Sequence, residues 1–79
     1  MNREEKDEEF EIREYSKLEL AILYSPGMRT ESALKKLNRW VRYNAPLTRK
    51  LEEIGEKWHR RSYLPGEVKW IVYYLGTPG

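Results

Sequence analysis

The segment from Thr30 to Tyr43 constrains the fold most strongly, because its residues divide between two chemically opposite faces of a helix. Apolar residues recur in it at helical spacing, at Ala33, Leu34, Leu37, Trp40 and Val41. At about 100° per residue, Lys35, Arg39 and Arg42 fall within about 60° of one another on the opposite side. One face of this helix is suited to a protein core, and the other is suited to anions.

Length and composition limit the chain to one small domain. It has 79 residues, of which 39% are hydrophobic, and a domain of this size buries only about 60% of its unfolded surface. It has no cysteine, so disulfides and thiolate metal sites are excluded and a cytoplasmic location is expected. The apolar runs Leu20–Tyr24 and Trp70–Leu75 are far shorter than the ~20 residues that cross a bilayer, so no membrane association is expected.

The formal charge of +2 is unevenly distributed along the chain. Residues 1–9 carry two cations against five acids, a net −3, which leaves +5 on the rest. Such a charged segment without an apolar cluster cannot offset its ordering entropy, so residues 1–9 are predicted to be a disordered acidic tail and residues 10–79 a single domain. Residues 29–61 contain ten cations and four acids. Their net charge of +6 is typical of a surface that binds polyanions.

The first half of the domain is predicted to contain a strand and two helices. Alternating residues indicate a strand over Phe10–Tyr15. Ser16 and Glu19 have the spacing of a capping box, followed by a helix that ends near Tyr24 because Ser25-Pro26-Gly27 breaks it. The buried side of this helix is expected to hold Leu18, Ala21 and Ile22, and Leu20 is a further candidate. The basic helix follows, with Thr30 as its cap and its end near Tyr43.

The second half is predicted to add two helices and a second strand. Pro46 is suited to open a helix that buries Leu47, Leu51 and Ile54 and ends at Gly55. Residues 56–64 alternate like a strand that pairs with residues 10–15. A last helix begins at Pro65, and its apolar stripe comprises Val68, Ile71, Val72 and Leu75. The predicted fold is mostly α, a small bundle of about four helices with a short two-stranded β element.

The order of these elements is similar to that of winged helix-turn-helix domains, although the segment from Ser25 to Arg29 is longer than the usual turn of three or four residues. A closer resemblance covers Phe10 to Pro78. The chain resembles domain-of-unknown-function family 4248, short bacterial proteins, in the spacings Phe10-x-Ile12-Arg13-x-Tyr15, Glu19-Leu20-Ala21, Ala33-x-x-x-Leu37-x-x-Trp40, Leu64-Pro65-x-x-Val68 and Leu75-Gly76-x-Pro78. The resemblance implies no activity. The family pattern has Thr or Ser where this chain has Leu64, so a side-chain cap is missing there.

The basic helix has two interpretations, a solvated surface or a site for a polyanion. Glu31 is the only acid in the helix, so the cations lack the carboxylate partners four residues away that surface helices usually carry. This favours phosphate contacts by Lys35, Lys36, Arg39 and Arg42. Lys57, Arg60 and Arg61 form either a wing that contacts the adjacent phosphate backbone of the nucleic acid or an ordinary polar segment. The sequence therefore predicts a module for double-stranded DNA, acting in transcriptional regulation or nucleoid organisation.

The last helix carries a second apolar face, formed by Trp70, Tyr73 and Tyr74. These aromatic residues pack in the core, form a homodimer interface, or stack on bases. Self-association or protein binding through this face is the alternative function.

The sequence predicts neither an enzyme nor a metal site. His59 is a lone histidine without cysteine, and the adjacent Glu52 and Glu53 point about 100° apart on a helix. No phosphate-binding glycine loop is present. We expect no cofactor, no metal and no small-molecule substrate.

Overall fold

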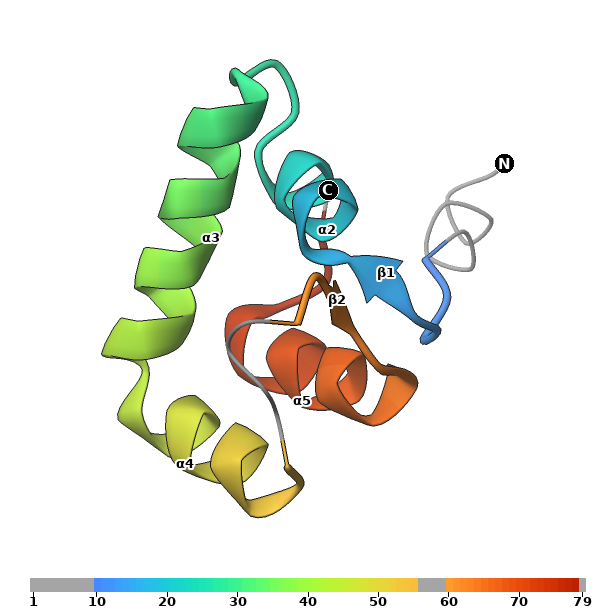
Figure 1. The fold of residues 1–79 in the computed structure, drawn as a ribbon, viewed down its shortest axis with the longest axis vertical. Helices are drawn as coiled ribbons and strands as arrows, with labels where there is room; N and C mark the ends of the chain where they lie inside the picture. The colour runs from blue at the N-terminus through green and yellow to red at the C-terminus, as the bar shows by residue number, and fades with distance from the viewer. Residues whose placement is uncertain (1–9, 56–59, 79) are drawn as a thin grey trace.

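The computed structural model describes residues 10–55 and 60–78, so the predicted tail over residues 1–9 lies outside the described residues. Within them the chain forms four helices and one two-stranded antiparallel sheet, as predicted. The elements are β1 (Tyr15–Ser16), α2 (Lys17–Tyr24), α3 (Thr30–Tyr43), α4 (Ala45–Glu53), β2 (Ser62–Tyr63) and α5 (Pro65–Leu75). Helix α3 runs along one long side of the molecule, with α2 and α4 packed at its two ends and α5 beside α4 (Figure 1).

A side-chain hydrogen bond caps the start of α2, whereas the start of α3 has no side-chain cap. The Ser16 hydroxyl accepts a hydrogen bond from the Glu19 amide at 2.9 Å, as the predicted capping box requires. The prediction that Thr30 caps α3 is wrong. Thr30 is the first helical residue, and Arg29 occupies the cap position with an extended backbone and no side-chain hydrogen bond.

Helix α4 begins one residue earlier than predicted, because Asn44 serves as its cap. The Asn44 side chain accepts from the Leu47 amide at 3.1 Å. At the other end Gly55 has a φ of +91°, the left-handed conformation expected of a terminating glycine. Ile54 was expected in the core but is exposed, since it occupies the cap position, where the helical spacing ends.

Helix α5 obtains its cap from within its own first turn. Leu64 has no polar side chain, and the Glu67 carboxylate accepts a hydrogen bond from the Leu64 amide at 2.7 Å. Val68 and Ile71 of the predicted stripe are fully buried, and Val72 is half-buried.

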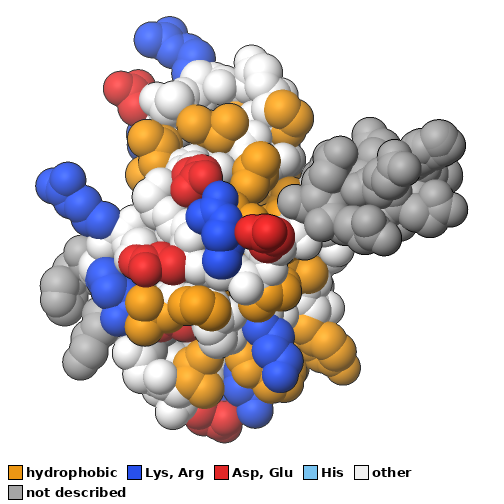
Figure 2. All heavy atoms as spheres, turned by 90° about the vertical axis from the view of Figure 1, so that its right-hand side faces the viewer, with side chains coloured by type: hydrophobic (Ala, Val, Ile, Leu, Met, Phe, Trp, Pro, Cys, Tyr) orange, Lys and Arg blue, Asp and Glu red, His pale blue; other side chains and the backbone are white. Residues whose placement is uncertain are grey.

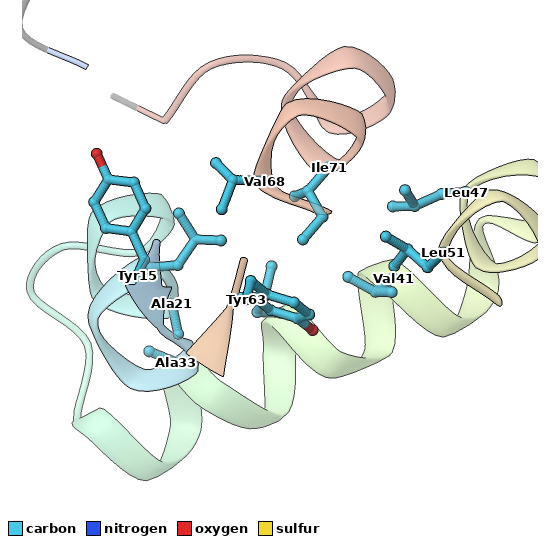
Figure 3. Packing of buried hydrophobic residues seen from close by; sticks show 11 residues of the cluster. Tyr15, Ala21, Ala33, Val41, Leu47, Leu51, Tyr63, Val68 and Ile71 are labelled. Atoms are coloured by element: carbon cyan, nitrogen blue, oxygen red, sulfur yellow. The ribbon is translucent and has the colours of Figure 1, made fainter. Parts of the chain in front are cut away.

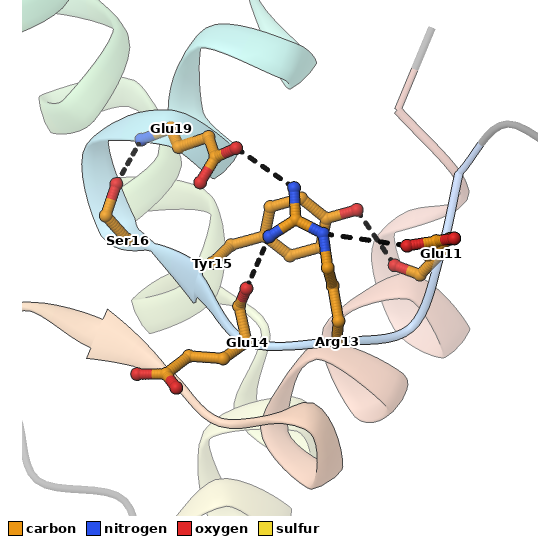
Figure 4. Close-up of polar contacts among 6 residues, drawn as sticks. All are labelled: Glu11, Arg13, Glu14, Tyr15, Ser16 and Glu19. Carbon is orange, nitrogen blue, oxygen red and sulfur yellow. Dashed lines mark hydrogen bonds and ion pairs between the residues drawn. The ribbon is translucent and has the colours of Figure 1, made fainter.

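The predicted strands pair, but each is only two residues long. Tyr15 faces Tyr63, and Ser16 faces Ser62. Residues 10–14 do not extend into a strand, because Arg13 turns back over Tyr15, with its guanidinium carbon 3.8 Å from the ring centroid (Figure 4).

Further contacts hold this turn together. Arg13 also pairs with Glu19 at 3.1 Å, and the Tyr15 hydroxyl donates to the carbonyl of Glu11 at 2.9 Å (Figure 4). The Phe10 ring stacks on Tyr15, with the centroids 5.3 Å apart. These contacts among residues 10–19 override the alternating pattern.

The core lies between the helices and the sheet. Figure 3 shows Val41, Leu51 and Ile71 pointing toward one another beside Tyr63. The fully buried side chains include Leu20, Leu37, Val41, Leu47, Leu51, Tyr63, Val68 and Ile71. No helix in the described ranges has the length and apolar character needed to cross a membrane.

The two helices on either side of the Ser25–Arg29 segment bury less apolar surface than predicted. Ala21 is buried in α2, but Leu18 and Ile22 are exposed, because this short helix is apolar nearly all round and packs on one side only. Trp40, counted with the core face of α3, is also partly exposed. Its indole meets the Tyr24 ring edge-on, with centroids 6.2 Å apart.

Candidate nucleic-acid interface

The rotation of α3 about its axis is fixed by its buried face. Ala33, Leu37 and Val41 are buried, as the periodicity predicts. Lys35, Arg39 and Arg42 are exposed on the opposite side. We call these three residues the basic ridge.

A hollow lies on each side of the basic ridge. One, of about 410 Å³, is lined by Met28, Ser32, Lys35, Lys36, Arg39 and Trp40. The other, of about 510 Å³, is bounded by α2, by α3 and by the segment before β2. We call the second the Arg42 pocket. Its lining residues are Ser16, Lys17, Leu18, Leu34, Asn38, Arg42, Arg60 and Arg61. The predicted cationic set is therefore divided, with Lys35, Lys36 and Arg39 on one side and Arg42 turned toward Arg60 and Arg61.

Cations of the ridge and cations elsewhere differ in their partners. Within residues 10–55 and 60–78, no carboxylate forms an ion pair with Lys35 or Arg39. The Lys36 ammonium lies 4.9 Å from the Trp40 ring centroid. Some cations elsewhere have carboxylate partners, for example Lys50 with Glu53 at 3.2 Å.

The face turned away from α3 has a mixed charge. Figure 2 shows acidic and basic side chains interspersed with hydrophobic ones on this face. Arg13 on this side lies between Glu11 and Glu19, and the hydrogen bond with Glu19 raises the pKa of Arg13 above its ordinary value. Among the described residues, Arg13 on this side is therefore balanced by carboxylates, unlike Lys35 and Arg39 of the ridge.

The three cations predicted near the second strand have different positions. Lys57 lies outside the described residues. Arg60 pairs with the buried Glu67, and its Nε donates to the Ser62 carbonyl at 3.2 Å. Arg61 is exposed, and its carbonyl accepts from the Lys17 amide at 2.8 Å. Arg60 is thus anchored to the fold, whereas Arg61 reaches solvent beside the ridge.

The aromatic residues of α5 are only partly available. Trp70 and Tyr74 are half-buried against the core, and Tyr73 is 71% exposed. The ammonium groups of Lys50 and Lys69 lie 4.7 and 5.7 Å from the Trp70 ring centroid. A hollow of about 480 Å³ on this side is lined by Ile12, Lys69, Trp70, Val72 and Tyr73.

Sequence reasoning missed two residues near the ridge. Lys17 lines the Arg42 pocket, although its ammonium lies 4.8 Å from the buried Tyr63 ring. Tyr24 supports Trp40, and its hydroxyl donates to the carbonyl of Gly76 at 2.6 Å. Burial raises the pKa of Tyr24 to about 12. Tyr24 and Trp40 lie in different helices, so neither helical nor strand periodicity could predict their contact. Within the described ranges, no group of three or more His, Cys, Asp or Glu residues is placed to hold a metal.

The fold and the site define a small helical domain in which a short helix, a five-residue connection and an outward-facing basic helix follow one another. Comparison with protein families places the chain in the domain of unknown function family DUF4248, which matches residues 11–78. The chain belongs to this family, as the sequence resemblance predicted. No curated protein and no solved structure matches it.

Proposed function

We propose that this chain binds double-stranded DNA through the basic ridge of α3 and acts as a DNA-binding module in transcriptional regulation or nucleoid organisation. The observation that carries the proposal is that Lys35 and Arg39 stand exposed on a helix with a buried opposite face and have no carboxylate partner among the described residues. Like charges four residues apart cost a helix about 0.2–0.5 kcal/mol, and phosphates relieve this repulsion.

The dimensions of α3 suit the major groove of DNA. An α-helix with side chains is about 10–12 Å across, and the groove is about 12 Å wide. The ridge from Lys35 to Arg42 spans about 10 Å along the helix axis, close to the length of three base pairs at 3.4 Å each. Helix α3 lies at the edge of the molecule, where a duplex can approach it (Figure 1).

Cations on both flanks of the ridge support the same orientation. Lys36 borders the hollow on one side of α3, and Arg61 borders the pocket on the other. With the ridge in the groove, these two side chains face the two phosphate backbones. Phosphate contacts of this kind fix position and orientation without specifying sequence.

The test measures how salt weakens binding. Fluorescence anisotropy with a labelled random duplex gives the dissociation constant at several salt concentrations, and each neutralised phosphate contributes about 0.9 to the slope of log affinity against log salt. We expect the double variant Lys35→Gln/Arg39→Gln to flatten this slope by up to about two units.

The matched control removes two cations from the other side of the molecule. Lys50→Gln/Lys69→Gln changes the net charge equally, but both side chains lie over Trp70 rather than on the ridge. Its slope should stay within about 0.5 units of the wild type, since only long-range electrostatics change. Equal slopes for the two double variants would contradict the proposal, as would tighter binding of single-stranded DNA or of RNA.

A second copy of the chain is the alternative partner. The observation that favours it is the exposed Tyr73 beside the mostly apolar hollow that contains Ile12 and Trp70. In a twofold arrangement, each Tyr73 enters the hollow of the other copy, and the assembly ends at a dimer. The half-burial of Trp70 and Tyr74 reduces the surface that remains for such an interface.

A further inference from the structure

We propose that the Arg42 pocket binds a small phosphate ester with a flat organic body, of the size of a nucleoside monophosphate. This inference goes beyond the proposed DNA binding: Arg42 and Arg61 belong to both surfaces, but the pocket can be tested without DNA. It rests on the size of the pocket, on the charges that converge on it, and on its apolar walls.

The volume of the pocket is suited to an organic molecule. It measures about 510 Å³, within the range of about 300–1,000 Å³ that is typical of ligand pockets. A lone inorganic anion would leave most of this space to water, since one water occupies about 30 Å³ of liquid.

Cationic residues line the pocket from three separate elements. Lys17 comes from the start of α2, Arg42 from α3, and Arg61 from the segment before β2. No acidic residue lines the pocket among the described residues. A guanidinium has five N–H donors and an ammonium three, so Arg42 and Lys17 can keep their internal partners and also donate to a ligand. Such a set of donors suits the several oxygens of a phosphate.

The remaining walls recognise a flat, partly polar body. Leu18, 41% exposed, and the half-buried Leu34 supply apolar surface from two helices. The side-chain amide of Asn38 offers both donors and an acceptor, the combination that pairs with the edge of a base. A phosphate joined to a heterocycle therefore satisfies all of the walls at once.

A backbone hydrogen bond joins two walls of the pocket, so this part of the site is formed before a ligand arrives. The Lys17 amide donates to the Arg61 carbonyl at 2.8 Å, which ties α2 to the segment before β2. Arg60, which also lines the pocket, is held by Glu67. Preformed walls reduce the entropy cost of binding.

The lining favours binding over a reaction. The hydroxyl of Ser16 caps α2 by accepting from the Glu19 amide. No described lining residue is an aspartate, a glutamate or a histidine that would act as a general base. We therefore assign the pocket to ligand recognition.

Calorimetric titration with adenosine 5′-monophosphate tests this inference without DNA. Inorganic phosphate, adenosine and decanoate serve as the comparison ligands. We expect one site, with the nucleotide bound at least tenfold more tightly than either phosphate or adenosine. Equal affinity for nucleotide and phosphate, tighter binding of decanoate, or no heat signal at millimolar nucleotide would overturn the proposal.

Two pairs of variants locate the site. Leu18→Glu places a carboxylate on the pocket wall, whereas Ile22→Glu places one on an exposed position of the same helix outside the lining. Arg61→Gln removes a lining cation, whereas Lys35→Gln removes a cation of the ridge. The first member of each pair should weaken nucleotide binding at least tenfold and the second less than threefold. Circular dichroism checks folding, and equal effects within the Arg61/Lys35 pair would refute the assignment even if Leu18→Glu unfolds the chain.

Discussion

Removal of the Glu67 carboxylate should destabilise the domain more than removal of any exposed acid. The side chain is 4% exposed, and it makes two polar contacts. One oxygen accepts from the Leu64 amide at 2.7 Å at the start of α5, and the other pairs with Arg60. Alanine at this position removes both contacts and leaves Arg60 beside an emptied site.

The magnitude follows from these two contacts. Loss of a helix cap costs about 1 kcal/mol, and breaking a buried ion pair costs about 3–5 kcal/mol. The ion pair here costs less, because the Arg60 side chain is 28% exposed and regains water. We expect Glu67→Ala to lower the free energy of unfolding by about 3 kcal/mol, and Glu67→Gln, which keeps an acceptor for Leu64, by about 1–2 kcal/mol.

Urea unfolding followed by tryptophan fluorescence measures these changes. The matched control is Glu53→Ala, which removes an ion pair to Lys50 from an exposed glutamate and should cost less than about 1 kcal/mol. A loss of about 3 kcal/mol corresponds to a fall of roughly 12–24 °C in the melting temperature of so small a domain. Equal losses for Glu67→Ala and Glu53→Ala would refute the reasoning.

Three further predictions concern pH, charge and association. Burial raises the pKa of Tyr24 to about 12, from about 10 in the unfolded chain. The free energy of unfolding should therefore fall as the pH rises from 10 to 12, and it should fall less steeply in Tyr24→Phe. Parallel curves for the two proteins in urea titrations at alkaline pH would show that Tyr24 does not cause this loss of stability. Deleting residues 1–9 removes a net −3 and should tighten DNA binding at low salt, and unchanged anisotropy curves would show that the acidic segment has no influence. Self-association through α5 predicts a dimer by light scattering at high micromolar concentration and a folded monomer for Tyr73→Lys, so a monomeric wild type would rule out this interface.

The helices were predictable because their signals are local. Apolar periodicity, the Ser16 cap and the glycine at position 55 each act within one helix, so the predicted ends agree with the structure to within about two residues. The pairing of two strands was also predictable from alternation. The strand lengths were not, because an alternation of apolar and polar residues gives no sign of the contacts that Arg13 makes with Glu19 and Tyr15.

The candidate site was predictable in part, for a similar reason. The outward face of α3 follows from the period of one helix. The division of its cations between two hollows depends on how α2 and the segment before β2 pack against α3, so Lys17 and Arg61 meet Arg42 only in the folded chain. The exposure of Leu18 was missed because α2 is apolar on several sides, and periodicity cannot choose between them.

The central claim is that α3 is the DNA-contacting element, and a nuclear magnetic resonance titration tests it most directly. Adding a short random duplex to the ¹⁵N-labelled chain at low salt should shift the signals of residues on the outer face of α3, around Ser32, Lys35 and Arg39, and leave those of α5 unchanged. The largest shifts on α5, or no shifts at all at low salt, would contradict the account.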